Sequence, residues 1–208
     1  ACATQPKAPP SPPDPASQMP ALAARIMAMV ETERMKIAPK AKMLTPDPEL
    51  SKVARGRARD MAAKHYLAHA APDGETSATL LMAQDADFQG LLGENLAAQH
   101  YTKQQGISVE AFAKRFLETW LDSPPHRENM AFADYDRTGV GAAVNGDTVY
   151  VALLFATDLG LAPRKAADGG KPTITRFATP KAASAAPVKP APAPIRLRGA
   201  LGIAGAQD

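Results

Sequence analysis

The stretch GVGAAVNGDTVYVALLF, residues 139–155, has the pattern of two strands joined by a tight turn. Asn145-Gly146 is a strong signal for a two-residue hairpin loop, and it predicts strands at Thr138–Val144 and Thr148–Thr157. Both alternate sets of side chains in the second strand are apolar, and such a strand must be covered on both faces. The hairpin therefore predicts a sheet between two other layers. One set is Val149, Val151, Leu153 and Phe155, and the other is Tyr150, Ala152 and Leu154.

Two amphipathic helices are expected near the N-terminal end of this region, because apolar residues recur there with a 3.6-residue period. The first is expected from about Ala21 to Lys36, and Pro39 ends it. Thr45 is the expected N-cap of the second helix, with Pro46 in its first turn, and this helix runs to about His65.

Two further helices are expected between the second helix and the hairpin. Thr76 or Ser77 caps a short one that ends near Ala86, and Ser108 caps a longer one. The longer helix has a broad aromatic stripe on one side, which we interpret as core. The stripe consists of Val109, Phe112, Ala113, Phe116, Trp120 and Leu121.

Four short motifs follow one another in a fixed order through this region. They are RDMAAKHYLAH (residues 59–69), GEN (93–95), WLDSPPHREN (120–129) and GVG followed by an apolar strand (139–155). Together they resemble the CAP superfamily, or SCP domain, of cysteine-rich secretory proteins, venom allergens and pathogenesis-related proteins. The resemblance covers about residues 21–159 and is closest to the bacterial branch. It implies an α+β fold, a three-layer α-β-α sandwich with a central antiparallel sheet.

The same resemblance implies a site at three residues. His69 matches the first family histidine, Glu94 of GEN the first family glutamate, and His126 the second family histidine. In the family these side chains converge in a surface cleft and can hold a divalent metal, with the two imidazoles as direct ligands. Two imidazoles with one or two oxygen donors suit zinc and leave positions for water or ligand.

Residues next to these three are expected to support the cleft. Asn95, Arg127 and Asn129 are interpreted as hydrogen-bonding residues that fix the loops around it. Ser123 stands where many relatives have a second glutamate, three residues after the tryptophan. This difference weakens the expected metal affinity.

A purely structural role for the three residues is the alternative. His69 would then cap the end of the second helix, and His126 would hydrogen-bond to backbone in a turn at Pro124-Pro125. The other two histidines, His65 and His100, are expected to face solvent. The segment His65-Tyr-Leu-Ala-His69 lacks the glutamate of a His-Glu-x-x-His protease motif.

Proline divides the chain into three parts, because the prolines crowd into residues 6–20 and 163–194. We expect a Pro-rich tether at 1–19, one folded domain at 20–160 and a basic Pro/Ala-rich tail at 161–208, mostly disordered. Within the tail, the stretch Ile195–Ile203 is apolar enough to pack against the domain.

Charge separates the tail from the domain. Residues 161–208 hold eight basic and two acidic residues, a net of +6, whereas residues 1–160 hold 16 basic and 19 acidic residues. The tail suits an anionic envelope surface through screened attraction, or is a solvated spacer without a partner. No basic patch interleaved with aromatic residues occurs in the domain, which argues against nucleic-acid binding.

The single cysteine, Cys2, is followed at once by the Pro-rich run. It is interpreted as the lipid-modified residue of a bacterial lipoprotein, and the alternative is that Ala1-Cys2-Ala3 is a signal-peptidase site or a cloning remnant. Both processing interpretations place the protein outside the cytoplasm. No stretch of about 18 apolar residues occurs, so no transmembrane segment is expected.

Three functions are consistent with these observations. The first is a binding or scaffold module that takes a lipid, a small molecule or a polymer in the cleft or adjoining grooves. The second is a metal-dependent hydrolase acting on peptide or cell-envelope material, with Glu94 as base and a metal-activated water. The third is a structural envelope protein.

Overall fold

The computed structural model describes residues 12–157 in full and residues 197–204 by their backbone. Cys2 and residues 161–196 of the basic tail lie outside the described residues. In chain order the elements are α1 (Pro15–Ile37), β1 (Thr45–Pro46), α2 (Pro48–Lys64), α3 (Ser77–Gln84), β2 (Leu92–His100), α4 (Val109–Asp122), α5 (Pro124–Ala131), β3 (Arg137–Asn145), β4 (Thr148–Ala156) and β5 (Leu197–Ala204).

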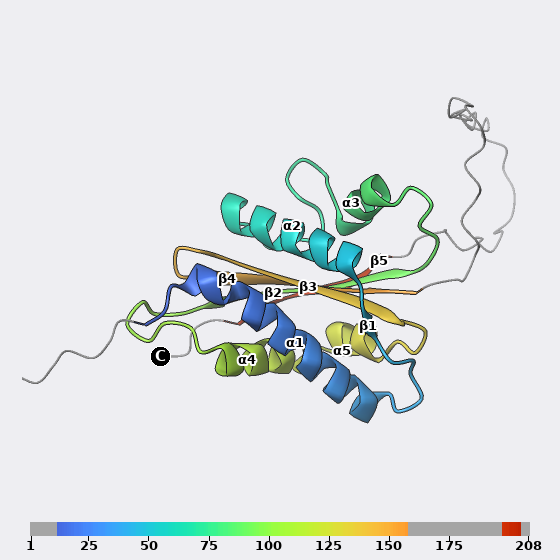
Figure 1. Cartoon of the computed structure of the whole chain (residues 1–208), viewed down its shortest axis with the longest axis horizontal. Coiled ribbons are helices and arrows are strands. Elements are labelled where there is room, and N and C mark those ends of the chain that lie inside the picture. The colour runs from blue at the N-terminus through green and yellow to red at the C-terminus, as the bar shows by residue number, and fades with distance from the viewer. Residues whose placement is uncertain (1–11, 158–196, 205–208) are drawn as a thin grey trace, which may run out of the picture.

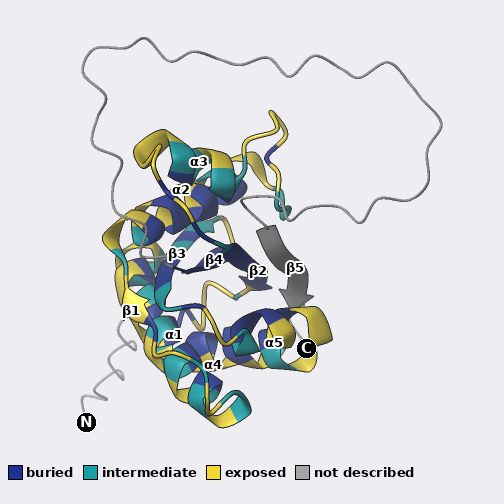
Figure 2. Ribbon diagram, turned by 90° about the vertical axis from the view of Figure 1, so that its right-hand side faces the viewer, coloured by how far each residue is buried: buried dark blue, intermediate teal, exposed yellow. Residues whose placement is uncertain are grey.

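The elements form three layers, as expected from the hairpin. Helices α2 and α3 cover one face of the sheet, called here the upper face, and α1, α4 and α5 cover the lower face (Figure 1). The strand order is β1-β3-β4-β2-β5. The three central strands are antiparallel, whereas β1 pairs in parallel with β3 and β5 in parallel with β2. Burial is concentrated in the central strands and in the helix faces turned towards them (Figure 2).

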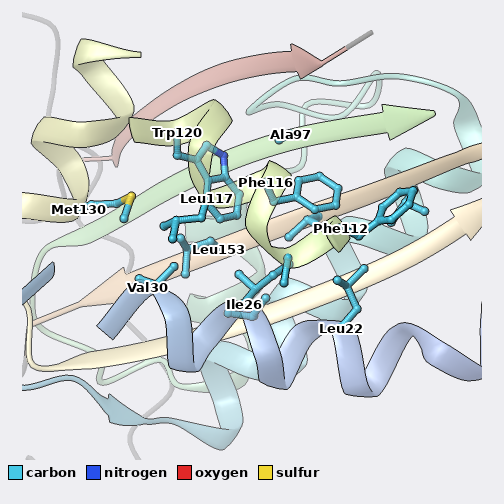
Figure 3. Packing of buried hydrophobic residues seen from close by; sticks show 14 of the residues in the cluster. Leu22, Ile26, Val30, Ala97, Phe112, Phe116, Leu117, Trp120, Met130 and Leu153 are labelled. Carbon is cyan, nitrogen blue, oxygen red and sulfur yellow. The ribbon is translucent and has the colours of Figure 1, made fainter. Parts of the chain in front are cut away.

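Each face of β4 contributes to a separate hydrophobic core. The lower core contains Phe155 and the aromatic stripe of α4, and Figure 3 shows Phe112, Phe116 and Trp120 packed over helix α1. The upper core contains Leu154 and packs against α2 and α3. Every residue of β4 is buried. The two cores explain why the strand needs apolar residues at consecutive positions.

The GVG motif allows α2 to lie close to the sheet. A Cβ atom at Gly139 would overlap the backbone of Leu50 and Ser51, and one at Gly141 would overlap the backbone of Ala54. Both glycines therefore serve helix–sheet packing.

The hairpin loop lies one residue later than expected. Asn145 belongs to β3 and pairs with Thr148, so the two loop residues are Gly146 and Asp147. Gly146 has a φ of 62°, whereas no positive φ occurs at Asp147. A positive φ at the first loop position alone matches a type II′ turn, which places glycine there.

Helix α1 begins at Pro15, so the expected start at Ala21 was wrong. The Asp14 side chain accepts a hydrogen bond from the amide of Ala16, and Pro15 occupies the first turn, where its missing N–H is harmless. Residues 15–19 are thus helical, and Met19 is buried in the lower core.

Helix α2 is capped by Asp47 and not by Thr45. One carboxylate oxygen of Asp47 accepts hydrogen bonds from the amides of Glu49 and Leu50, each at 2.9 Å. The residues expected to start the helix form β1 instead, because the amide of Thr45 donates to the carbonyl of Asp136 at 2.8 Å.

Two caps agree with expectation and one turn does not. Thr76 caps α3, in a capping box with Thr79, and Ser108 caps α4. Pro124-Pro125 does not form a turn, because both prolines lie in the first turn of helix α5.

Candidate functional site

The charged residue Glu94 is fully buried in the middle layer. It lies on β2 and faces the upper layer, on the same side as Leu92 and Leu96 of the upper core. His69 donates from Nδ1 to Glu94 Oε2 at 2.6 Å, and the Ser77 hydroxyl donates to Oε1 at 2.5 Å. Both carboxylate oxygens therefore have partners, as a buried carboxylate requires.

Arg57 is the cation that accompanies this carboxylate. Its Nε lies 3.8 Å from Glu94 Oε1, and neither side chain is exposed. Its Nη2 donates to the carbonyls of Ala68 and His69, at 2.7 and 3.2 Å. Arg57 thus holds the loop that carries His69. We call Arg57, His69, Ser77 and Glu94 the upper cluster.

A second set of contacts extends the upper cluster towards the surface. Arg57 Nη1 donates to the Tyr66 hydroxyl at 2.7 Å, and this hydroxyl donates to Asp60 at 2.5 Å. Burial disfavours the Asp60 anion, but hydrogen bonds from Lys64 and Tyr66 and the nearby cations outweigh it and hold the pKa of Asp60 below its usual range. Burial and the hydrogen bond to Asp60 raise the pKa of Tyr66 to about 12.

The His69 imidazole has one nitrogen that its contacts do not use. Nε2 is buried and has no hydrogen-bond partner among the described residues. In a neutral imidazole whose Nδ1 donates, Nε2 carries the lone pair. A carboxylate on the far nitrogen is the usual arrangement behind a metal-binding histidine.

His126 lies on the other side of β2, in the first turn of α5. It is fully buried, and its backbone carbonyl accepts a hydrogen bond from Asn95 Nδ2 at 3.1 Å. Asn95 Oδ1 accepts from Asn129 Nδ2 at 2.9 Å, and Asn129 Oδ1 accepts from the Tyr135 hydroxyl at 3.0 Å. We call Asn95, His126, Asn129 and Tyr135 the lower cluster.

Gly93 makes room for the lower cluster. A Cβ atom there would overlap the Tyr135 hydroxyl and lie 2.7 Å from Asn129 Oδ1. The GEN motif therefore has three separate tasks. Gly93 gives space, Glu94 joins β2 to the upper layer, and Asn95 joins it to α5.

The expected site residues are brought together only in part. His69 and Glu94 are in contact, but within the described ranges no three His, Cys, Asp or Glu side chains form a group that could hold a metal. The His69 side chain contacts β2 from the upper layer through Glu94, and the His126 backbone contacts it from the lower layer through Asn95. The side chains present would supply two imidazoles at most, with the other metal positions left to water or a ligand.

Of the residues expected to support the cleft, some make the expected contacts and others do not. Asn95 and Asn129 form hydrogen bonds of the expected kind. Ser123 joins α4 to α5 without a capping bond from its side chain. Arg127 is exposed, and its side chain makes no ion pair or hydrogen bond within the described residues, so the expected loop-fixing contacts do not occur there. His65 and His100 are exposed, as expected.

Sequence reasoning missed Arg57 and Ser77. Arg57 lies on the apolar side of α2, one turn from Val53 and from Met61. A charged residue within an apolar stripe is a signal of a buried partner, so Arg57 could have been found. Ser77 had no such signal, since its role depends on where α3 meets β2.

A surface groove lies elsewhere, between α1 and α2, along the part of the β3 edge that β1 does not pair with. Its volume is about 510 Å³, and its wall is mostly apolar. Arg55 and Arg59 of α2 line it, and both are exposed without an ion pair among the described residues. The other lining residues are Ala16, Met19, Pro20, Ala23, Ala24 and Met27 of α1, Ser51 of α2, and Val140, Ala142, Ala143 and Val144 of β3.

No helix in the described ranges is both long and apolar enough to cross a membrane.

Comparison with known proteins identifies similar chains in bacteria. The uncharacterized protein YkwD of Bacillus subtilis is 26% identical over 122 residues, which cover 59% of this chain and 42% of YkwD. This chain thus matches less than half of that relative's length.

Two solved structures have the same fold. An outer surface protein of Borrelia burgdorferi superposes with a TM-score of 0.54 at 23% identity, covering 66% of this chain and 92% of that one. An extracellular SCP-domain protein of Bacillus anthracis superposes with a TM-score of 0.51 at 22% identity, covering 73% and 45%. The family model for the cysteine-rich secretory protein family, CAP, matches residues 29–157. The fold, the order of the motifs and this match agree: the chain belongs to the CAP family of cysteine-rich secretory proteins.

Proposed function

We propose that this protein is an extracytoplasmic binding module, and that its groove between α1 and α2 takes a small anionic amphiphile. The observation that carries the proposal is an apolar groove of about 510 Å³ with two arginines on one wall that form no ion pair within the described residues. Ligand sites are typically apolar hollows of about 300–1,000 Å³ with a few polar groups that orient the ligand.

The two arginines favour a ligand with a negative head group. Arg55 and Arg59 are one helical turn apart, so their like charges disfavour the helix by a few tenths of a kcal/mol, about 0.2–0.5. A carboxylate, sulfate or phosphate between them would reverse this effect and accept charge-assisted hydrogen bonds. The apolar part of the ligand would lie along the α1 wall, near Ala24 and Met27.

The test compares decanoate with decanol, which have the same chain and differ in charge. Calorimetry on the full chain should detect decanoate and find decanol at least about tenfold weaker, a difference of about 1.4 kcal/mol. Arg55→Gln with Arg59→Gln should remove this preference, and Lys52→Gln, on the same helix but outside the groove, should keep it.

A second pair of variants tests whether the ligand binds in the groove. Ala24 and Ala28 are both exposed on α1, but only Ala24 lines the groove. Ala24→Trp should block decanoate, whereas Ala28→Trp should bind it as the wild type does. Equal binding by the two tryptophan variants would overturn the proposal.

A divalent metal at His69 is the second candidate. The buried Nε2, which has no partner among the described residues, supports it, with Nδ1 fixed by Glu94 and His126 as the other imidazole. Binding would be weak, because so few protein donors are available. Zinc titration of the full chain should show affinity that His69→Ala and His126→Ala reduce and His65→Ala leaves unchanged. Affinity should fall on acidification, because imidazole coordinates only when neutral.

A metal-dependent hydrolase has less support. Both oxygens of Glu94 already accept hydrogen bonds from His69 and Ser77, so this carboxylate is poorly placed to take a proton from water. An activity screen on peptides and cell-envelope material, with and without chelator, would test this alternative. Chelator-sensitive turnover that Glu94→Gln abolishes would favour the enzyme.

The extracytoplasmic location is also part of the proposal. The two similar structures come from proteins described as an outer surface protein and an extracellular protein. Cys2 is the proposed lipidation site, and the basic tail would approach an anionic envelope surface. Expressed with its native leader, Cys2→Ser should move from the membrane fraction to the soluble fraction. A wild type that is already soluble would favour simple secretion.

A further inference from the structure

We propose that the outer edge of β2 is an acceptor site for an extended apolar peptide, and that residues 197–204 of the same chain are its resident occupant. This inference is independent of the α1–α2 groove, because it concerns the opposite edge of the sheet. It rests on the direction of the β2 backbone groups, on the register of β5 and on the way β5 is connected.

The backbone of β2 presents alternate residues to its two neighbours. The carbonyl of Leu91 accepts from the amide of Thr157 at 3.0 Å, and the amide of Tyr101 donates to the carbonyl of Asp147 at 2.9 Å. Both bonds point towards the β4 side and involve the odd-numbered residues that directly flank β2. Because N–H and C=O groups alternate along a strand, the even-numbered residues point towards the outer edge.

An uncovered β2 edge would expose four amides in a row. These belong to Leu92, Glu94, Leu96 and Ala98, all of which are buried. Such an edge readily pairs with another strand. β5 covers it in parallel from Leu92 to Gln99.

The register of β5 matches the side-chain pattern of β2. Leu201 pairs with Leu96 and Ile203 with Ala98, so apolar residue types occupy matching register positions of the two strands. Gly199 lies opposite Glu94, so a residue without a side chain stands next to the buried carboxylate. We therefore expect the site to favour peptides that carry the residue types of β5 at these register positions.

The connection to β5 is much longer than the geometry requires. β4 ends at Ala156 and β5 begins at Leu197, and both of these residues pair with Leu92. Two strand spacings, about 10 Å, separate them, yet residues 158–196 lie between them in sequence. The closure entropy of a long connection grows slowly with its length. Pairing of β5 with β2 can therefore be treated as binding of a ligand that is tethered to its own site. The same pairing by a separate peptide would be strand addition.

The occupied edge adjoins the upper cluster. The main chain of Glu94 faces β5 while its side chain holds His69, and the β5 backbone also lies near α5. Displacement of β5 would therefore uncover the strand that joins the upper and lower clusters.

Residue-resolved amide exchange of the full chain tests the site. In Leu201→Asp, amides of Leu92, Glu94, Leu96 and Ala98 should exchange at least about tenfold faster than in the wild type, since their partner strand is lost. Amides of the odd-numbered residues 93–99 should change less than about threefold, because they bond to β4. Lys189→Asp, which alters charge in the tail outside β5, should change neither set. The proposal would be overturned if the exchange rates of the even-numbered amides were unchanged in Leu201→Asp. It would also be overturned if exchange of the even- and odd-numbered amides accelerated equally in both Leu201→Asp and Gly199→Pro.

A separate peptide added to the protein tests whether the β2 edge accepts a strand in trans. A tethered strand has an effective concentration of the order of mM, so the peptide is added to Leu201→Asp, where competition is removed. The peptide IRLRGALGIAGA, residues 195–206, should restore protection of the even-numbered amides, and the same peptide with aspartate at position 201 should not. No restoration by the first peptide would overturn the acceptor site. Wild-type protection that rises with protein concentration together with dimer formation would overturn the resident occupant, because a second copy would then supply the strand.

Discussion

The upper and lower clusters flank the same strand but differ in chemistry. The upper cluster contains a buried carboxylate, a buried guanidinium and an imidazole, drawn from α2, α3, β2 and the loop after α2. The lower cluster joins Asn95, Asn129 and Tyr135 through neutral side-chain hydrogen bonds and binds the backbone of His126. Adjacent residues, Glu94 and Asn95, are the centres of the two.

Because of this difference, we expect the lower cluster to contain mainly stabilising amides and the upper cluster to contain a reactive imidazole. The amides of the lower cluster bond to one another and to backbone, so they fix α5 on the sheet. The upper cluster also fixes a loop, but it leaves His69 Nε2 without a partner in the described region. We therefore expect the upper cluster to supply the first metal ligand, whereas the amides of the lower cluster support the fold.

The largest effect is expected when the upper cluster loses its carboxylate. Glu94→Ala leaves Arg57 buried without the carboxylate beside its Nε, which should lower the free energy of unfolding by about 3–5 kcal/mol. Urea unfolding, monitored by circular dichroism, measures this loss of stability. Arg57→Met with Glu94→Leu should recover most of this loss, because an apolar pair avoids the unpaired charge. A double variant as unstable as Glu94→Ala would contradict this explanation.

Gly93→Ala should have the next largest effect, through the lower cluster. The added Cβ would overlap the Tyr135 hydroxyl, and overpacking of this kind destabilises by about 2–3 kcal/mol. Gly56→Ala is the matched control, since no atom lies within 4 Å of a Cβ at this position in α2. It should stabilise the protein by up to about 1 kcal/mol. Equal effects of the two substitutions would show that Gly93 is not needed for space.

Asn95→Ala should destabilise the protein by about 2 kcal/mol, because it leaves the Asn129 amide and the His126 carbonyl each without one buried partner. A cycle with Asn129→Ala should show coupling of at least about 0.5 kcal/mol. Strict additivity would mean that the bond between the two amides contributes little. Zinc affinity should change less in Asn95→Ala than in His69→Ala if the two clusters have separate tasks.

Asp60→Asn should have the smallest effect, about 1 kcal/mol at pH 7. The pKa of Asp60 is held below the unfolded value of about 3.9. Its stabilising contribution is therefore fully present above about pH 4 to 5 and is lost as the pH falls through the folded pKa. The difference in unfolding free energy between wild type and variant should be constant from about pH 7 to about 5 and shrink below about 4. A difference that grows on acidification would reverse the assigned sign.

Most of the fold was predictable from local patterns. The three layers followed from the apolar residues at consecutive positions of β4. Ser108 was predicted as a cap, and so was Thr76 as one of two candidates. The errors lie at element starts. Pro15 and Pro48 each follow an aspartate cap, and the expected starts at Ala21 and Thr45 overlooked this Asp-Pro signal.

The sequence by itself determined the layered sheet and the family, because alternation along a strand and motif order are local properties of the chain. Only the tertiary structure decided which motif residues meet. Glu94 and Asn95 are neighbours in sequence, but a strand directs consecutive side chains to opposite faces, so His69 joins one cluster and His126 the other. The pairing of β5 with β2 was decided in the same way, because an edge strand finds its partner by register and burial over a long separation in sequence.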